Sequence, residues 1–173
     1  MSAGMNLEEG KLSKIELLES APHFSFLNFG DKNVLVVYMT IEEFLPGDPL
    51  IHEGEIQDKT HFIFEGKAEV VKASAEGERV SIARVGRGDI VGEAALQPNL
   101  IQSTVVVRAL DKTKTLCLPR NAFEEMMIDT PQTAFKLLFD VIRLLRRRLN
   151  ETSNKFADHV GDIIVDDSQQ DEQ

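Results

Sequence analysis

The chain has 173 residues, 42% of them hydrophobic, and a net charge of −10 from 19 basic and 29 acidic residues. That length fits one domain with extensions, and the negative charge opposes DNA or RNA binding by the domain as a whole. No apolar run approaches a membrane span and the N-terminus lacks a signal pattern, so we expect a cytoplasmic protein. The single cysteine, Cys117, excludes an internal disulfide and lies in an apolar alternation typical of a core residue.

The first forty residues indicate a helical segment ahead of the main domain. Residues 1–10 are polar and rich in small residues, which is typical of a loose terminus. Residues 11–20 place apolar side chains at helical spacing, and Ala21-Pro22 ends that pattern. The run Val34–Tyr38 fits a helix or a strand, and we favour a helix because the pattern changes to strands only after it. We therefore predict an N-terminal helical segment over residues 1–40.

After residue 40, short apolar runs alternate with glycine turns. Turn signals such as Pro46-Gly47-Asp48 and Ala75-Glu76-Gly77 follow nearly every run, and the latter would join a hairpin with a polar tip. Many short strands at such close spacing indicate a sandwich or a jelly-roll barrel. The expected strands are residues 42–45, 50–52, 60–64, 68–72, 79–85, 104–110 and 114–118. The predicted fold is mainly β with flanking helices, with a double-stranded β-helix (jelly-roll) barrel over residues 41–119.

Between two of these strands the sequence predicts a short helix. Asp89 fits the N-cap position, Ile90–Leu96 would form one or two turns, and Pro98 would stop them. The free backbone N–H groups and the positive dipole end of such a helix suit an anion, most naturally a phosphate. Gly92 would let a ligand approach the backbone closely, and Glu93 could accept hydrogen bonds from ligand hydroxyls. The alternative is a capped connecting helix that binds no ligand.

The last third of the chain predicts lid and dimerisation helices over residues 120–158 and an acidic flexible tail over residues 159–173. Asp129-Thr130-Pro131 is a helix-start signal, and apolar residues then recur in a heptad pattern. The seam extends beyond what one small barrel can cover, and an exposed apolar stripe of that length predicts a parallel homodimer. The expected interface residues are Leu138, Ile142, Leu145, Leu149, Thr152 and Phe156.

Four arginines, Arg143 and Arg146–Arg148, lie near the middle of the long helix. A solvated helix face is the simpler interpretation, and pairing with the acidic tail or with a partner's carboxylates is the alternative. About fifteen residues follow Asp158, too few for a helix-turn-helix module, so we expect no DNA binding.

Taken in order, these elements resemble the cyclic nucleotide-binding domain. That domain is the regulatory module of catabolite-activator-type proteins, protein kinase A regulatory subunits and cyclic-nucleotide-gated channels. The resemblance covers roughly residues 24–149 and rests on the turn glycines and on four stretches, which are Gly54-Glu55 with Phe62–Gly66, Val85–Leu96, Val107–Leu110 and Leu116–Phe123. Val85–Leu96 is similar to the family's phosphate-binding cassette. Val107–Leu110 and Leu116–Phe123 are similar to its closing strands and to the start of its helical lid.

The resemblance implies where a cyclic nucleotide would bind. In the family, a glycine–glutamate pair and the small residues after it present backbone amides to the cyclic phosphate, and the glutamate takes the ribose 2′-hydroxyl. Those positions are Gly92–Ala95 here, and neutral donors at residues 102–104 would add to them. The expected ligand contacts are Val91, Gly92, Glu93, Ala94, Ala95, Gln102, Ser103 and Thr104.

The chain departs from the family at the arginine that pairs with the phosphate charge. Counting forward from Glu93 places that arginine at Gln102, and counting back from Arg108 places it at Ser103. No lysine or arginine lies between Arg87 and Arg108. Losing a charge-assisted contact should weaken an anionic ligand by about tenfold or more.

These patterns predict a regulatory module that binds cAMP or cGMP and signals through its C-terminal helix to a protein partner that the sequence does not identify. The alternative is a domain with a vestigial pocket that acts as a ligand-independent dimer or adaptor. A metal-dependent enzyme of the barrel type would need converging histidines. Of His23, His52, His61 and His159, only His52 and His61 fall in expected strands. Because nucleophile and P-loop motifs are also missing, we expect no catalysis, no metal and no membrane contact.

Overall fold

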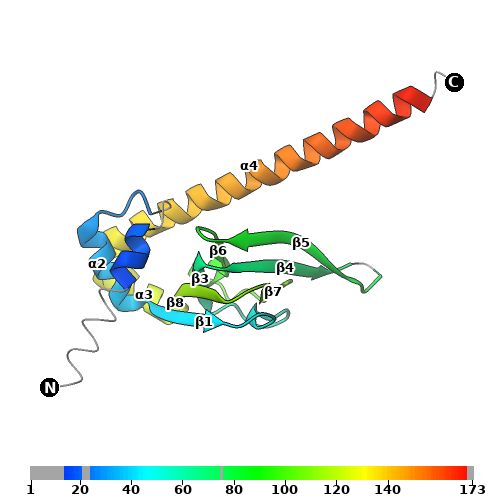
Figure 1. The fold of residues 1–173 in the computed structure, drawn as a ribbon. Helices are drawn as coiled ribbons and strands as arrows, with labels where there is room; N and C mark the ends of the chain where they lie inside the picture. Colours follow the sequence, from blue (N-terminus) through cyan, green and yellow to red (C-terminus); the bar gives the residue numbers. More distant parts are fainter. Residues whose placement is uncertain (1–13, 21–23, 75, 171–173) are drawn as a thin grey trace.

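The chain folds into two antiparallel sheets with helices at one end and a long C-terminal helix (Figure 1). The computed structural model describes the backbone of residues 14–20, 24–74 and 76–170, and the side chains as far as Ala157 apart from Lys155. The strands are β1 (Thr40–Phe44), β2 (Pro49–Ile51), β3 (Lys59–Glu65), β4 (Lys67–Ala73), β5 (Arg79–Gly86), β6 (Ile90–Val91), β7 (Val106–Ala109) and β8 (Thr113–Pro119). The helices are α2 (Phe29–Tyr38), the 3-10 helix η1 (Glu93–Leu96), α3 (Arg120–Asp129) and α4 (Pro131–Gln170).

The strand order confirms the predicted mainly β fold with flanking helices. One sheet has the order β1-β8-β3-β6 and the other the order β2-β7-β4-β5, and every pair is antiparallel. The hairpin expected around residues 75–77 is the β4–β5 pair. Because β1 begins at Thr40 and β8 ends at Pro119, the sheets occupy residues 40–119.

The described part of the N-terminal segment contains two helices, with irregular residues just before α2. Residues 14–20 form a helix, and the first residues of the helix expected at 11–20 lie outside the described residues. The ambiguous run after residue 31 is the helix α2, as favoured from the sequence. Its start is fixed by a capping box in which Asn28 and Asp31 each accept a hydrogen bond from the other's backbone N–H at 2.9 Å.

Two apolar clusters hold the layers together. The larger joins the first sheet, through residues such as Phe62 and Leu116, to apolar residues of the helices. The smaller lies between the two sheets and includes Ile63 of β3 and Val107 of β7. Since successive residues of a strand point to opposite faces, β3 contributes to both clusters. The helices therefore cover the face of the first sheet that points away from the second.

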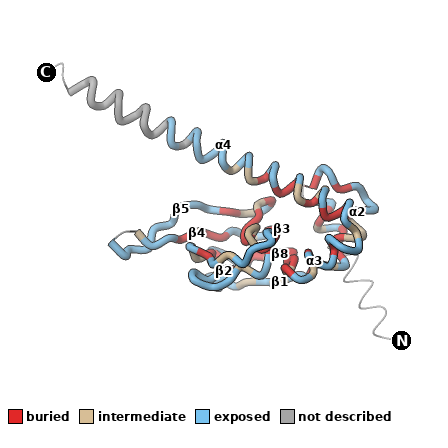
Figure 2. Tube along the Cα trace, turned by 180° about the vertical axis from the view of Figure 1, so that it is seen from behind, coloured by how far each residue is buried: buried red, intermediate tan, exposed pale blue. Residues whose placement is uncertain are grey.

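The helix α4 is longer than the sequence indicated, because it continues to Gln170 through residues expected to be a flexible tail. Figure 2 shows buried residues along its first part, where it lies on the body, and exposed residues farther along. No proline follows Pro131, so no residue type in this stretch breaks the helix by itself. Once the first turns are held by packing, each further residue that becomes ordered adds one backbone hydrogen bond, and the helix can continue. No helix among the described residues has the length and hydrophobicity that a bilayer span requires.

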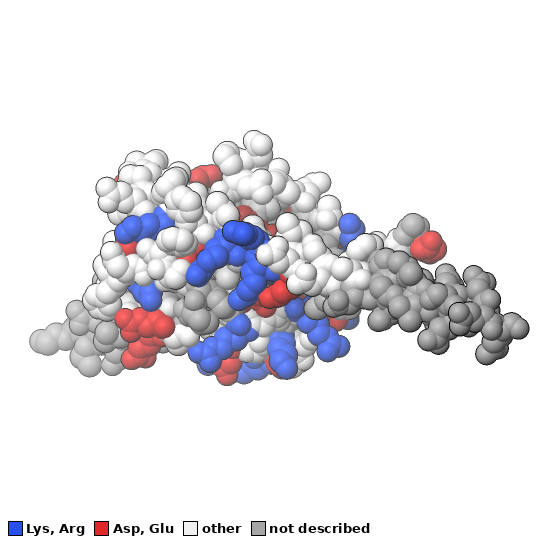
Figure 3. Space-filling view, turned by 90° about the horizontal axis from the view of Figure 1, so that it is seen from above, with Lys and Arg blue, Asp and Glu red and all other residues white. Residues whose placement is uncertain are grey.

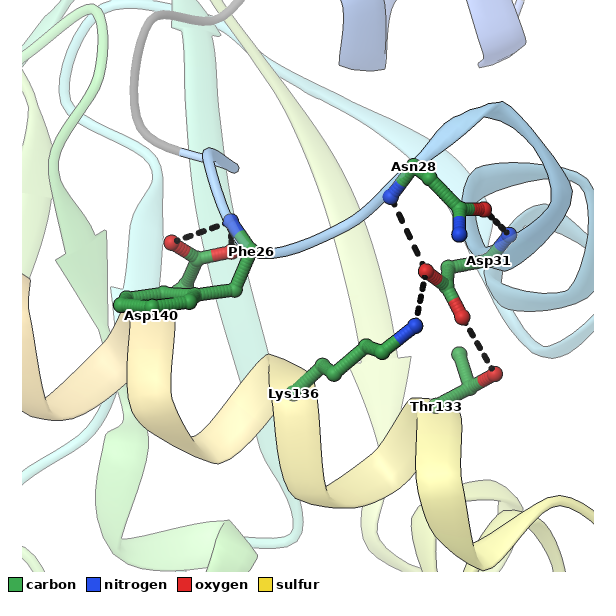
Figure 4. Close-up of polar contacts among 6 residues, drawn as sticks. All are labelled: Phe26, Asn28, Asp31, Thr133, Lys136 and Asp140. Carbon is green, nitrogen blue, oxygen red and sulfur yellow. Dashed lines mark hydrogen bonds and ion pairs between the residues drawn. The ribbon is translucent and has the colours of Figure 1, made fainter.

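The buried carboxylate of Asp140 fastens α4 to the chain just before α2 (Figure 4). Its oxygens accept hydrogen bonds from the backbone N–H groups of Ser25 at 3.1 Å and Phe26 at 3.2 Å. Arg143 lies 3.2 Å away on the same helix. Burial raises the pKa of Asp140 in spite of these partners, so the contact carries the cost of a desolvated carboxylate.

A second carboxylate, that of Asp31, joins α2 to α4 (Figure 4). It accepts hydrogen bonds from Lys136 Nζ at 2.7 Å and from the Thr133 hydroxyl at 3.2 Å, in addition to the backbone N–H of Asn28. Burial by itself raises the pKa of Asp31, but these donors outweigh it. The pKa of Asp31 therefore lies below its ordinary value of 3.8.

We expect Asp31→Asn to lower the free energy of unfolding by about 1–2 kcal/mol at neutral pH, because it removes the charge that faces Lys136. Since the pKa of Asp31 is lowered in the folded state, its stabilisation is present above the unfolded pKa. It is lost as the pH falls through the folded pKa, that is, below pH 3.8. Urea unfolding should show a smaller difference between the two proteins at about pH 3 than at about pH 7. Asp129→Asn, at the exposed end of α3, should show neither effect, and an equal difference at both pH values would contradict this account.

Candidate functional site

The residues before the candidate ligand site form a strand rather than the expected helix. Ile90 and Val91 are β6, paired with Phe62 and His61 of β3, so Asp89 caps no helix and the helix predicted over residues 90–96 is confined to η1 at Glu93–Leu96. The edge of β3 that faces away from β8 has backbone groups free to pair there. Ile90 and Val91 are β-branched and therefore favour the strand that pairs with them. Asp89 instead accepts a hydrogen bond from the backbone N–H of Gly86 at 2.9 Å and closes the turn between β5 and β6.

Gly92 makes the turn from β6 into η1. Its φ is +74°, in the left-handed region that glycine adopts without strain. A Cβ at this position would lie 2.3 Å from the carbonyl oxygen of Lys59 and 3.4 Å from the Ile51 side chain. The Thr60 hydroxyl donates to the Gly92 carbonyl at 3.0 Å. Strand β3 therefore confines Gly92 through the Lys59 backbone and the Thr60 side chain.

The turn at Gly92 leaves two backbone N–H groups without an acceptor inside the helix. The Ala95 N–H donates to the Gly92 carbonyl at 3.0 Å, and Glu93 and Ala94 precede that first helical hydrogen bond. Both of these residues are half-buried, so their amides can meet a ligand at the surface of the fold. This is the arrangement of donors that the resemblance to the family implies.

The other expected contact residues are placed differently from one another. Val91 packs in the smaller apolar cluster and Ala95 is buried, so their side chains support the turn. Ser103 is buried, and its hydroxyl donates to the Val105 carbonyl at 2.8 Å. The side chains of Gln102 and Thr104 are exposed. Of the neutral donors considered from the sequence, the Ser103 hydroxyl therefore already has an acceptor within its own loop.

The buried Arg120 holds the end of η1, a role that the sequence did not show. It begins α3, and its guanidinium donates to the carbonyl oxygens of Ala94, Gln97 and Asn99. Its Nε is buried without a hydrogen-bond partner among the described atoms. Three carbonyls gathered on one cation make the loop after the candidate site depend on the position of α3.

The basic residues of α4 join that helix to the start of the candidate site. Figure 3 shows Lys and Arg side chains gathered at the middle of the face along which α4 runs. Arg147 Nη2 lies 3.0 Å from Asp89 Oδ1, and Arg148 donates to the Ile90 carbonyl. Since Arg143 also pairs with Asp140, the interpretation of these arginines as a purely solvated face is wrong for three of the four. The turn that carries Gly92 is tied to α4 at one end and to α3 at the other.

A small cavity of about 60 Å³ adjoins the Gly92 turn. It is lined by residues 50–52, 55–59 and His61, and Ile51 and Lys59 among them also approach Gly92. Ligand pockets for small molecules are typically about 300–1,000 Å³, so this cavity accommodates water rather than a nucleotide. A nucleotide at the amides of Glu93 and Ala94 therefore needs the open surface or a movement of the neighbouring loop.

The expected dimer seam is divided between two faces of α4. Leu138 and Leu145 pack against the larger apolar cluster, whereas Ile142, Leu149 and Phe156 are 60–70% exposed. Thr152 is exposed and its hydroxyl donates to the Arg148 carbonyl. Phe135 and Phe139, which the sequence-based interface omitted, are 60% and 44% exposed. The exposed apolar stripe thus consists of Phe135, Phe139, Ile142, Leu149 and Phe156.

The two histidines expected in strands have different surroundings, and His52 lies just after the end of β2. His52 is exposed, whereas His61 is 2% exposed and its Nδ1 lies 3.2 Å from the Thr115 hydroxyl oxygen. Burial lowers the pKa of His61 to about 4, so its imidazole is neutral. The nearby Cys117 is fully buried, as expected, and burial raises the pKa of its thiol to about 12.

Comparison with known proteins gives one family. A profile of the cyclic nucleotide-binding domain matches residues 41–130. The cAMP-dependent protein kinase regulatory subunit of Yarrowia lipolytica is 32% identical over 110 residues, which are 64% of this chain and 28% of that protein. The chain spans between 8% and 50% of the length of such curated relatives.

Solved structures show the same fold. A cyclic nucleotide-binding domain from Methylobacillus flagellatus has a TM-score of 0.73 at 23% identity, covering 84% of this chain and 81% of that chain. The regulatory subunit of a cAMP-independent protein kinase A from Trypanosoma cruzi, bound to guanosine, has a TM-score of 0.64 at 28% identity. That match covers 75% of this chain and 45% of the Trypanosoma chain.

We expect Gly92→Ala to destabilise the protein more than Gly54→Ala does. Both glycines have positive φ, +74° and +80°, so either substitution costs about 1–2 kcal/mol for the left-handed backbone. Only the Cβ at Gly92 would also meet backbone, and the contact with Lys59 should add about 1–3 kcal/mol. Urea unfolding measures both losses, and equal values would show that β3 does not hold the turn as described.

Proposed function

Because this chain belongs to the cyclic nucleotide-binding domain family, we propose that it is a regulatory module that binds a cyclic nucleotide, cAMP or cGMP, at the Gly92 turn. In this proposal the backbone amides of Glu93 and Ala94 take the cyclic phosphate, and the Glu93 carboxylate accepts the ribose 2′-hydroxyl. The observation that carries the proposal is the turn itself, with its positive-φ glycine and its two amides that precede the first helical hydrogen bond.

The positions where the resemblance would place a phosphate-pairing arginine carry no charge in this chain. Gln102, Ser103 and Thr104 are neutral, and the Ser103 hydroxyl is already engaged. This favours a second candidate ligand, a purine nucleoside that carries no phosphate charge. The guanosine in the Trypanosoma cruzi relative supports that candidate, because that protein is described as cAMP-independent.

We propose that the bound ligand signals through α4 to a protein partner. The contacts of Arg147 with Asp89 and of Arg148 with Ile90 lie two to three residues before Gly92, and Arg120 holds the residues that follow it. A ligand that shifts the turn must therefore shift or strain its contacts with both helices. Such a ligand changes the affinity for the partner only if it binds more tightly when α4 is in one position than when α4 is in the other.

The exposed stripe on α4 supports a homodimer as the second part of the proposal. Five large apolar side chains follow one face of the helix over three turns or more, and such a patch is costly to leave in water. The spacing of seven between Phe135, Ile142, Leu149 and Phe156 suits a parallel coiled coil. No catalytic step belongs to the proposed function, since its site consists of amides and a carboxylate that hold a ligand unchanged.

Calorimetric titration of the purified chain with cAMP, cGMP and guanosine separates these proposals. We expect Gln102→Arg to raise the affinity for the cyclic nucleotides by about tenfold or more and to leave that for guanosine unchanged, because it supplies the missing charge. Glu93→Ala should weaken every ligand that offers a ribose 2′-hydroxyl. Gln102→Glu is the matched control, since it places the opposite charge at the same position.

The outcomes distinguish the candidates. Guanosine binding without cyclic nucleotide binding favours the nucleoside. No heat from any ligand, with either the wild type or Gln102→Arg, would reject ligand sensing and favour the ligand-independent dimer or adaptor.

We expect Ile142→Glu to convert the homodimer into monomers, because it places a charge in the middle of the exposed stripe. Sedimentation equilibrium over a range of concentrations measures the effect. Asn154→Glu adds the same charge on an exposed position outside the stripe and should leave the mass unchanged. Leu145 is unsuitable for this test, since it packs against the larger cluster and its substitution would destabilise the fold itself. A wild-type protein that is monomeric throughout would remove the dimer.

A further inference from the structure

Three side chains of different chemistry converge on the strands β1, β3 and β8, close to the Gly92 turn. Glu42, His61 and Cys117 each offer one ligand atom, and these atoms lie within 4.8 Å of one another. We propose that this cluster binds a thiophilic divalent transition-metal ion, Zn²⁺ in the first instance. The proposal does not depend on any nucleotide.

The register of the first sheet produces the cluster. Cys117 of β8 lies directly opposite Thr40 of β1 and His61 of β3, and Glu42 of β1 lies opposite Thr115. Residues opposite one another in an antiparallel pair share a face, and so do residues two apart on one strand. All three candidate ligands therefore project from one face. Ile63, two residues after His61, shares that face and packs between the two sheets.

The donors match the ligand preferences of Zn²⁺. Thiolate, imidazole and carboxylate are its usual protein ligands, and at their normal bond lengths tetrahedral donor atoms stand roughly 3.5 Å apart. Glu42 Oε2 lies 4.0 Å from His61 Nδ1, and rotation of the partly exposed Glu42 side chain can shorten that separation. A water that arrives with the ion would serve as the fourth ligand. Coordination would release the Cys117 thiol proton to solvent.

The imidazole of His61 is held in place before any metal arrives. Its Nδ1 lies 3.2 Å from the Thr115 hydroxyl oxygen, and its ring meets the Phe44 ring edge-on at 5.6 Å between centroids. A fixed ring and the fully buried Cys117 provide two rigid ligands. Because the Nδ1 that meets Thr115 is also the nitrogen that faces Glu42, coordination through Nδ1 would replace the Thr115 hydrogen bond, and the buried ring would stay held by its packing against Phe44.

Lys59 is the natural competitor of the metal. Its Nζ lies 3.0 Å from Glu42 Oε1, whereas Oε2 of the same carboxylate faces His61 Nδ1 at 4.0 Å. A metal would therefore take Oε2 first and would weaken the lysine contact by charge repulsion. Removing the lysine charge should strengthen metal binding.

Titration of the full chain with Co²⁺ alone, after dialysis against a chelator, tests the site. We expect a thiolate-to-cobalt charge-transfer absorption that saturates at one equivalent and disappears when Zn²⁺ is added. Cys117→Ser should abolish that absorption. Glu42→Gln should weaken Co²⁺ binding by about tenfold or more, and Lys59→Met should strengthen it.

The neighbouring carboxylate supplies the matched control. Glu43→Gln changes the adjacent residue of β1, which points to the opposite face and pairs with Lys112 and Lys114, and it should leave Co²⁺ binding unchanged. Circular dichroism checks the fold of each variant. If Cys117→Ser does not fold, the comparison of Glu42→Gln with Glu43→Gln tests the metal site instead. A folded wild type without the charge-transfer absorption, or equal weakening by the two glutamate substitutions, would overturn the proposal.

Discussion

The burial of β8 is the constraint on which the rest of the structure depends. No residue of this strand is exposed, and it pairs with β1 on one side and β3 on the other. Leu116 and Leu118 supply the larger apolar cluster beneath the helices, so β8 fixes where the helices rest. The strand ends at Pro119, and the next residue, Arg120, begins α3 and holds the carbonyls after the Gly92 turn. One buried strand thus positions the core, the lid helix and the candidate ligand site.

The Gly92 turn lies where three parts of the fold meet. β3 holds it through Thr60 and Lys59, α4 holds the residues before it, and α3 holds the residues after it. A turn held from three sides does not move independently of its neighbours, which gives a physical basis for coupling a ligand to a helix. The same strand β3 carries His61, one residue after Thr60, so the proposed metal cluster and the proposed nucleotide site share a support.

Much of the fold was predictable from local pattern. Alternating apolar runs and glycine turns located the strands, and the capping signal at residues 129–131 located the start of α4. The short segment Ile90–Val91 was misassigned because two apolar residues after an aspartate fit a helix start as well as a strand. Pairing with β3 decided the matter, and that pairing depends on a partner some thirty residues away in the chain.

The sequence by itself determined the sheet-rich barrel, the long helix, the burial of Cys117 and the neutral residues at 102–104, because each is a local property of composition or period. Only the tertiary structure decided which strand lies beside which, and therefore that Glu42 and His61 approach Cys117. It also decided how α4 is turned on the body, which packs the partly buried Leu138 against the larger cluster and exposes Phe139. A periodic pattern gives the faces of an element, whereas the neighbour that covers each face is chosen by contacts distant in sequence.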